Sequence, residues 1–365
     1  MSNTGLPVAP AQAAWRGRAV RKSWGSILVP AIAVVAICTD AQAAAHKGFV
    51  TFEVSGEPVT SAYGINSEGV VTGFYTDASN ISHGFVRAAD GMVSPFDFSG
   101  AKETLPFAIN KSGAVTGYWN ALETDTPDHG FVLNADGSGA SFDPSGSIAT
   151  HPFGINNKGE VAGDYIDASH ILHGFVRTPG GDIIAFDPPG SSQTDVGGIS
   201  QKGTVVGSYM GALIPGGPEH SHGFLRTRDG SFTTFDPSGS SDTVAVAIAK
   251  EEVDGVAEVA VTGYFNDGGG FHGFVRLSDG TITTFDVPGA ADTFPTSVNA
   301  KGAAVGFYED SSVHFHGFER APDGTITTID LGNSEDTRCT DINSKGQITG
   351  WSGGNQSVFG FIGKP

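Results

Sequence analysis

Histidine and aspartate residues recur at fixed places along this sequence, and they are the first groups that could do chemistry. A His-Gly-Phe tripeptide occurs six times, at His83, His129, His173, His222, His272 and His316. A turn and then an aspartate follow each copy, at Asp97, Asp143, Asp187, Asp236, Asp286 and Asp330. Six imidazoles could bind metal ions, but we favour a hydrogen bond between each histidine and the aspartate of its own repeat.

Residues that differ between the repeats are better candidates for a binding site. A threonine recurs in the loop that enters every repeat, where we expect its hydroxyl to cap the loop. The residue after it varies: Ser61, Leu105, His151, Asp195, Val244, Phe294 and Arg338. We expect these residues to surround the mouth of a central channel and to bind ligand through His151, Asp195, Arg338 and Phe294. Glu103, which precedes one of the threonines, adds an acid to this candidate site.

Four further aspartates follow an aromatic position in their repeats, or its equivalent, by two residues. They are Asp77, Asp167, Asp267 and Asp310. If these acids converge on one face, they could hold Ca²⁺, which takes six to eight oxygen ligands. The sequence contains no EF-hand or other compact calcium loop, so a solvated acidic rim is the alternative interpretation.

Short enzyme motifs are almost absent from the sequence. It has no His-Glu-x-x-His, no P-loop and no Cys-x-x-Cys. The segment 350–354 (GWSGG) matches Gly-x-Ser-x-Gly, but a nucleophile elbow needs a strand–turn–helix context, and this segment lies where a strand enters a loop. His151, Asp195 and Glu103 could still act as acid and base on a polysaccharide or lactone-type substrate. A hydrolase or lyase is therefore the alternative to a binding protein.

All of these residues belong to a repeat of 43 to 50 residues that occurs seven times. Each copy predicts four short strands, a to d: strand a ends in a Gly-Ile-Asn type segment, b reads Val-x-Gly-x-Tyr, c contains His-Gly-Phe and d ends in Phe-Asp. Asn caps the a–b turn through its side chain, and Gly supplies positive φ. Four strands in about 45 residues is the unit of a β-propeller blade.

The two ends of the chain complete this pattern. The seventh copy stops at its third strand, 359–362, while 50–54 resembles the fourth strands of later copies. The sequence therefore predicts an all-β, seven-bladed β-propeller with four-stranded blades, whose last blade is closed by the N-terminal strand. The a–b and c–d turns then lie at one end of each blade. The longer, variable b–c and d–a loops lie at the other, where we expect the binding surface.

These repeats resemble the bacterial extracellular repeat proteins named for a His-Ala-Phe signature. The resemblance covers about residues 48–363. It rests on the Gly-Ile-Asn-x-x-Gly-x-Val-x-Gly-x-Tyr segment and on His-Gly-Phe, in which Gly replaces the family's Ala. It implies an extracellular repeat architecture and transfers no catalytic residue to this chain.

Composition limits the classes of protein that fit. The chain of 365 residues has 53 Gly and 19 Pro, yet 39% apolar residues and 25 Phe can build a core, which excludes global disorder. The glycines predict many turns between short strands. With 39 acidic and 20 basic residues, the net charge is −19, which argues against nucleic acid or anionic lipid as a partner.

Residues 1–45 differ from the rest and predict a secretory signal peptide with cleavage near Ala43. Four basic residues precede an apolar run, 27–38, and a small-residue stretch, 41–45. Acylation at Cys38 and retention of the segment as an anchor remain alternatives. The mature region, 46–365, keeps only Cys339, so an internal disulfide is excluded, and we expect this thiol to be a small buried apolar group.

We therefore expect a secreted or periplasmic protein, monomeric and without a membrane span once the signal is cleaved. It would act as a binding or scaffold module for a glycan, a small molecule or another protein, through its variable loops.

Overall fold

The computed structural model describes residues 48–54, 56–121, 127–211, 219–250, 260–331, 336–354 and 357–365. These residues contain 28 strands and no helix. The described part of the chain therefore has no helix that is long and apolar enough to cross a membrane. The expected signal peptide, 1–45, lies outside the described residues.

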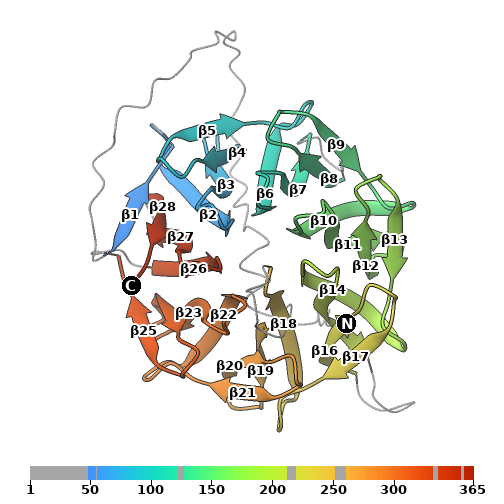
Figure 1. Ribbon diagram of the computed structural model, residues 1–365, viewed down its shortest axis with the longest axis vertical. Coiled ribbons are helices and arrows are strands. Elements are labelled where there is room, and N and C mark those ends of the chain that lie inside the picture. Colours follow the sequence, from blue (N-terminus) through green and yellow to red (C-terminus); the bar gives the residue numbers. More distant parts are fainter. Residues whose placement is uncertain are drawn as a thin grey trace, which may run out of the picture. The chain divides into compact units, whose positions relative to one another are not determined.

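Most strands form separate four-stranded antiparallel sheets, each built from consecutive strands (Figure 1). The first contains β6 (Glu103–Ile109), β7 (Val115–Asn120), β8 (His129–Leu133) and β9 (Gly139–Phe142). The second contains β10 (Ser147–Ile155), β11 (Val161–Asp167), β12 (Leu172–Arg177) and β13 (Ile183–Phe186). The third contains β14 (Ser191–Ile199), β15 (Val205–Gly211), β16 (His220–Arg226) and β17 (Phe232–Phe235). The fourth contains β18 (Asp242–Ile248), β19 (Val261–Asn266), β20 (Phe271–Arg276) and β21 (Ile282–Phe285). The fifth contains β22 (Asp292–Val298), β23 (Ala304–Glu309), β24 (Phe315–Arg320) and β25 (Ile326–Ile329).

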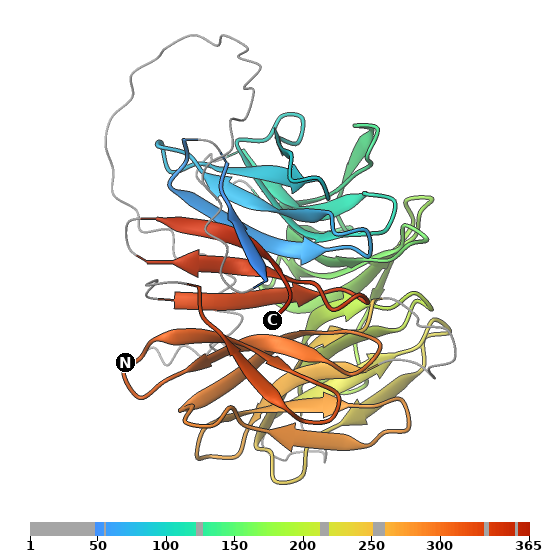
Figure 2. The ribbon, with the colours of Figure 1, turned by 60° about the vertical axis from the view of Figure 1, so that its left-hand side comes forward.

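The remaining strands form one eight-stranded sheet from the two ends of the described chain (Figures 1 and 2). Its N-terminal part contains β1 (Phe49–Phe52), β2 (Val59–Ile65), β3 (Val71–Thr76), β4 (Ser82–Arg87) and β5 (Val93–Phe96). Its C-terminal part contains β26 (Asp336–Ile342), β27 (Ile348–Gly353) and β28 (Val358–Gly363). β1 pairs antiparallel with β28 over four residues, whereas β2 meets β28 at a single parallel pair, Val59 and Val358.

The sheets surround a central axis in the manner of a β-propeller, and we call each run of consecutive strands a blade. The first strand of each blade is innermost and contacts the first strands of its two neighbours, including β26 with β2 (Figure 1). We call the end of the blades with the a–b and c–d turns the turn face. The end with the b–c and d–a loops is the loop face.

Asparagines at the turn face both shape the first turn of a blade and join it to the next blade. Asn66 Oδ1 accepts the N–H groups of Glu68 and Val70, both at 3.0 Å, and Gly69 has φ of 80°. Its amide donates to the carbonyl of Asn110 at 2.9 Å, and Asn343 donates in the same way to Asn66. The turn cap expected from sequence is confirmed. The interlock between blades is an additional role of the same side chain.

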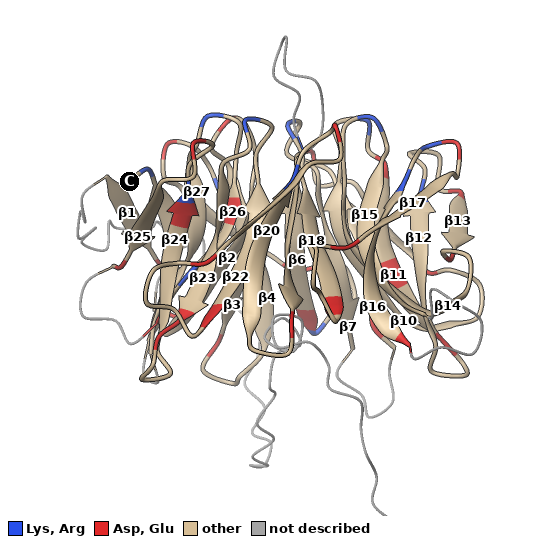
Figure 3. Ribbon diagram, turned by 90° about the horizontal axis from the view of Figure 1, so that it is seen from below, with Lys and Arg blue, Asp and Glu red and all other residues tan. Residues whose placement is uncertain are grey.

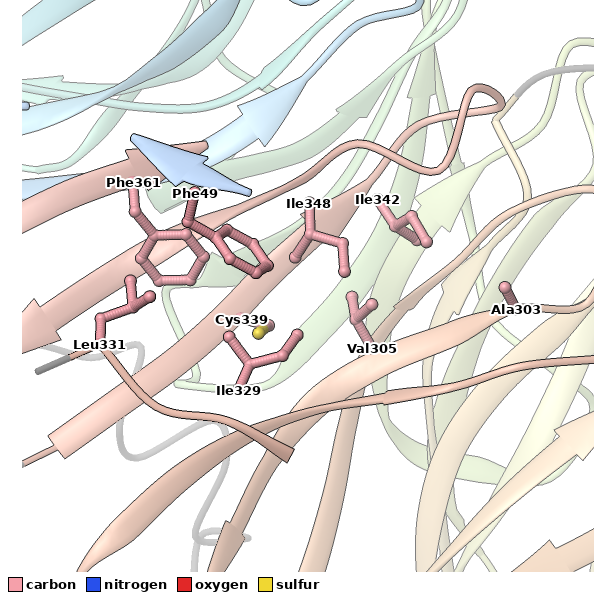
Figure 4. Close-up of a cluster of buried hydrophobic side chains, with 9 residues drawn as sticks. All are labelled: Phe49, Ala303, Val305, Ile329, Leu331, Cys339, Ile342, Ile348 and Phe361. Atoms are coloured by element: carbon pink, nitrogen blue, oxygen red, sulfur yellow. The ribbon is translucent and has the colours of Figure 1, made fainter. Parts of the chain in front are cut away.

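The core lies between the blades and contains the phenylalanine of every His-Gly-Phe copy, fully buried. Near the chain ends, Phe49 of β1 packs edge-to-face on Phe361 of β28, beside Cys339 (Figure 4). Burial raises the pKa of the Cys339 thiol well above its usual range. The expectation that Cys339 is a small buried apolar group is confirmed.

Candidate functional site

The repeated histidines pair with aspartates inside their own blades, as the sequence predicts. Nδ1 of each histidine lies within hydrogen-bond distance of the carboxylate that ends strand d, for example 2.8 Å from His83 to Asp97 and 2.7 Å from His129 to Asp143. The other pairs are His173–Asp187, His222–Asp236, His272–Asp286 and His316–Asp330. Each ring also packs on an aromatic ring of strand b, such as Tyr75 under His83, 5.1 Å between centroids.

The four aspartates considered as calcium ligands cap their own b–c turns. Asp77 Oδ1 accepts two turn N–H groups, both at 2.8 Å, and its Oδ2 lies 3.6 Å from His83 Nε2. Asp167, Asp267 and Asp310 contact the histidines of their blades in the same way. Within the described ranges, no three His, Cys, Asp or Glu residues group as metal ligands. Each of these aspartates caps its own hairpin, so the structure does not bring the four together as ligands of one calcium ion.

These histidines give the fold a pH dependence with a definite sign. Burial alone lowers the pKa of His316, but the hydrogen bonds and charges of Asp330 and Asp310 outweigh it, so the pKa is raised. The pKa of His272 is raised for the same reasons. For His151, burial is again outweighed, here by Asp128 and Asp164, and the pKa rises to about 9.

A raised histidine pKa stabilises the fold fully below the unfolded value, about 6.5, and this stabilisation is lost as pH rises through the folded value. Asp167 and Asp310 have lowered pKa values, mainly through turn hydrogen bonds, so their contribution is lost as pH falls below about 4. We expect the melting temperature to be highest near pH 5 to 6, about midway between these limits, and to fall toward pH 9. The measurement is thermal unfolding at constant ionic strength, beside His151→Phe, whose decline above pH 7 should be shallower. A melting temperature that rises from pH 6 to pH 9 would contradict this prediction.

The variable residues lie in the innermost strands, together with the threonine before them. The threonine was expected in a loop. Instead it is a fully buried strand residue, although its hydroxyl does cap the loop in several blades: Thr104 Oγ1 accepts the N–H of Phe98 at 3.0 Å. At least three of the variable residues, His151, Phe294 and Arg338, contact side chains of the preceding blade. Phe294, for example, is 3% exposed and packs on Tyr264, so it is part of the core.

His151 and Glu103 belong to one polar network on the loop-face side of β6 and β10. The two imidazole nitrogens of His151 each lie 3.3 Å from a carboxylate, Nδ1 from Asp164 and Nε2 from Asp128. The amide of Asn120 contacts both Asp128 and Glu103, at 3.2 and 3.1 Å. The structure therefore brings these two predicted residues together. Asp195 follows on the next innermost strand, β14, opposite Ser208.

Arg338 lies within an aromatic cluster between β26 and the preceding blade. Its guanidinium is 4.0 Å from the ring centroid of Phe315, 4.7 Å from Phe307 and 5.1 Å from Trp351. Burial lowers the pKa of Arg338, yet an arginine side chain keeps its charge. Phe294 packs on Phe307, 5.3 Å between ring centroids, and so adjoins this cluster.

Sequence reasoning missed the residues at a β-bulge in each innermost strand. Every innermost strand shifts register at the same place in the repeat, and β10 and β14 shift once more near their starts. The bulged residue at the shared place is Tyr63 in β2, Phe107 in β6 and Phe153 in β10. Bulges re-aim side chains and occur next to active sites. In the other blades the bulged residue is Gly197, Val246, Thr296 or Thr340. The signal in the sequence was an aromatic residue at one place in three consecutive repeats.

The bulged aromatics form a continuous arc on one side of the axis. Tyr63 lies 5.4 Å from Phe107 between centroids, and Phe107 lies 5.9 Å from Phe153. Tyr118 extends the arc to His151 at 5.2 Å. At the other end, burial raises the pKa of Tyr63 to about 12, although the charge of Arg338 acts to lower it. We call Tyr63, Phe107, Tyr118 and Phe153, with His151 and Arg338 at its ends, the aromatic arc.

Lysine and arginine lie mainly at one face of the propeller, beside acids of the c–d turns such as Asp90 and Asp136, whereas the other face is mainly acidic (Figure 3). Acids dominate the loop face, among them Asp77, Glu103, Asp128, Asp167, Asp242, Asp292, Asp310 and Asp336. Lysines gather in the a–b turns at the turn face: Lys111, Lys158, Lys202, Lys301 and Lys345. The turn face also holds a shallow axial pocket, at the end of the axis opposite to the expected mouth.

The chain matches no protein-family model and no curated protein sequence. Its fold is similar to that of the β-propeller domain of the Trilobed protease from Pyrococcus furiosus, with a TM-score of 0.57, 12% identity, and coverage of 83% of this chain and 96% of that one. An acylaminoacyl peptidase from Pyrococcus horikoshii is also similar, with a TM-score of 0.54, 14% identity and coverage of 83% and 51%. So is puromycin hydrolase, with a TM-score of 0.53, 13% identity and coverage of 85% and 52%. The chain spans about half the length of these two enzymes. It is an all-β protein with a β-propeller fold, and at these identities the likeness extends to the fold alone.

Proposed function

We propose that this chain is an exported β-propeller binding module that holds a carbohydrate at the aromatic arc. The observation that supports this most is the arc itself: aromatic rings next to the axis, of which Tyr63, Tyr118 and Phe153 are partly exposed and Phe107 is buried. A guanidinium lies at one end of the arc, and an imidazole between two carboxylates lies at the other. Ligand sites commonly combine apolar and aromatic surface with a few fixed polar groups.

A sugar ring fits this combination of groups. Its apolar C–H face packs on aromatic rings, which offer large surface in a fixed geometry. Its hydroxyl groups both donate and accept hydrogen bonds, so they match charged donors such as Arg338 and acceptors such as Asp128 and Glu103. A purely apolar ligand would shield these charged groups from water without replacing the hydrogen bonds that water makes to them.

The scaffold that we propose for this site has seven four-stranded blades. The eight-stranded sheet then divides at the single β2–β28 pair into two blades, and β1 supplies the outer strand of the last one. The four-residue pairing of β1 with β28 and the contact of β26 with β2 support this division. Export through residues 1–45, a secreted or periplasmic location and a monomeric state belong to the same proposal.

Hydrolase or lyase activity has less support from the geometry. His151 would be the general base, but both of its nitrogens face carboxylates and its pKa is raised to about 9, so it is charged at neutral pH. Ser352 is fully buried and its hydroxyl contacts Thr337 Oγ1 at 2.8 Å. Neither side chain is arranged to attack a substrate.

The test is a panel of neutral and acidic oligosaccharides, with binding and product formation measured together. For a glycan that binds, Tyr63→Leu and Phe153→Leu should each weaken affinity about tenfold, or 1.4 kcal/mol. Tyr165→Leu is the matched control, because Tyr165 is half-buried but packs on His173 away from the axis. No binding across the panel, or equal losses in the control, would rule out the arc as a carbohydrate site. Product formation that depends on His151 would instead favour the enzyme.

A further inference from the structure

The pocket at the turn face is separate from the aromatic arc and has a chemistry of its own. It lies where the innermost strands end, above an apolar floor of Ile65, Ile109, Ile155, Val298 and Ile342.

Amide oxygens around this pocket are already used by backbone N–H groups. Asn66 Oδ1 accepts two N–H groups of its own turn, and Asn110 Oδ1 accepts that of Ala114 at 3.0 Å. Two further amide side chains line the pocket. Asn157 Oδ1 accepts the N–H of Lys111, and Gln201 Oε1 accepts the N–H of Asn157, both at 2.9 Å. The hydrogen-bonding capacity that these side chains offer to a ligand is therefore on their –NH₂ groups.

An –NH₂ group carries two hydrogens. The interlock between blades uses one of them on Asn66 and Asn110, whose amides donate to the carbonyls of the next innermost strands at 2.9 and 3.0 Å. These bonds also fix the amides in place, so the donors are ordered before a ligand arrives, which lowers the entropic cost of binding.

Two lysines add positive charge to the wall of the pocket. Lys111 is 63% exposed, and its ammonium lies 4.0 Å from Glu68 at the rim. Lys250 Nζ lies 2.7 Å from Asp341 Oδ2. Asp341 is 2% exposed and its oxygens also accept the N–H of Ile65 and the hydroxyl of Ser297, at 2.8 and 2.7 Å. The oxygens of Asp341 are thus already bonded to protein groups. Among the described residues, no carboxylate lines the pocket itself.

Donors, two ammonium groups and an apolar floor together define the ligand. We propose that the turn-face pocket binds a small organic carboxylate, whose oxygens accept from the amide ring and the lysines and whose carbon body packs on the isoleucine floor. This site lies at the other end of the axis from the aromatic arc, and the proposal does not depend on carbohydrate binding there.

The experiment uses succinate as the probe, titrated into the mature protein and followed by calorimetry or NMR. Succinamide provides a neutral analogue of the same shape, and inorganic phosphate provides an anion without a carbon body. We expect succinate to bind, and succinamide and phosphate to bind at least about tenfold more weakly. Lys111→Gln should weaken succinate binding about fivefold to tenfold.

Lys345→Gln is the matched control. Lys345 is 56% exposed, lies on the same face and is 3.8 Å from the same Glu68, but it is outside the pocket wall. Tyr63→Leu should leave succinate binding unchanged, which separates this site from the arc. The proposal is overturned if succinate does not bind, if phosphate binds as tightly as succinate, or if Lys345→Gln loses as much affinity as Lys111→Gln. Both lysines are exposed at the surface, so neither variant threatens the fold.

Discussion

Asp341→Ala should destabilise the propeller by about 3 kcal/mol or more, because it removes one member of a buried ion pair and leaves its partners without an acceptor. Three groups from three other innermost strands or their ends lose the carboxylate: the N–H of Ile65, the hydroxyl of Ser297 and the ammonium of Lys250. They come from the chain on both sides of the junction between β26 and β2, so the loss falls where the first and last blades meet.

The measurement is equilibrium unfolding in urea, with Lys250→Met beside Asp341→Ala. Lys250 is 29% exposed, and its removal leaves Asp341 with three donors, the N–H groups of Ile65 and Ile342 and the hydroxyl of Ser297, so Lys250→Met should cost clearly less. Asp323→Ala, at an exposed c–d turn, is the surface control and should cost at most about 1 kcal/mol. If Asp341→Ala unfolds at the same urea concentration as this control, the carboxylate does not hold the blades together.

Nothing in the repeat pattern marks Asp341 as important except that it is charged. The same place in the other repeats is occupied by small residues: Gly64, Ala108, Gly154, Gly198, Ala247 and Ser297. A carboxylate among such residues must be paired if it is buried, and this much follows from the sequence. Its partner does not, because Lys250 is 91 residues away and lies in the most degenerate repeat.

The architecture could be read from sequence because it is repeated. Seven copies average out local ambiguity, so the four strands, the Asn-capped turn and the His–Asp pair within each blade were all predicted. Each of these features depends on residues that are neighbours within one hairpin. Local spacing is then enough to determine which groups meet.

The candidate site was predicted less well because it depends on where side chains point around the axis. The bulge in each innermost strand adds one residue to the alternation, and a sequence pattern does not show it. Phe294 and Phe107 are both buried, whereas Tyr63 and Phe153, which were not considered, are partly exposed at the two bulges beside Phe107. His151 and Glu103 lie in one network because Asn120 and Asp128 of the neighbouring blade connect them.

The glycine of His-Gly-Phe is the clearest departure from the His-Ala-Phe signature that these repeats resemble, and packing explains it. A Cβ added at Gly84 would lie 2.7 Å from the ring of Phe96, which strand d places directly opposite. In β24, where strand d carries Ile329 instead, a Cβ on Gly317 would lie 2.9 Å from both Cys339 Sγ and the Ile329 carbonyl oxygen, so glycine is favoured there without an aromatic ring. In the blade of Gly84, the ring of Phe96 occupies the space that a methyl group would need.

Gly84→Ala should consequently destabilise the protein by about 2 kcal/mol, the cost of one extra carbon in a packed core. Phe96→Leu in the same chain should recover at least half of this loss, because the shorter side chain leaves room for the methyl group. The readout is a double-mutant cycle of unfolding free energies, in which the coupling between the two positions should exceed about 1 kcal/mol. Additive effects would mean that Phe96 does not exclude alanine. The glycine would then need another cause.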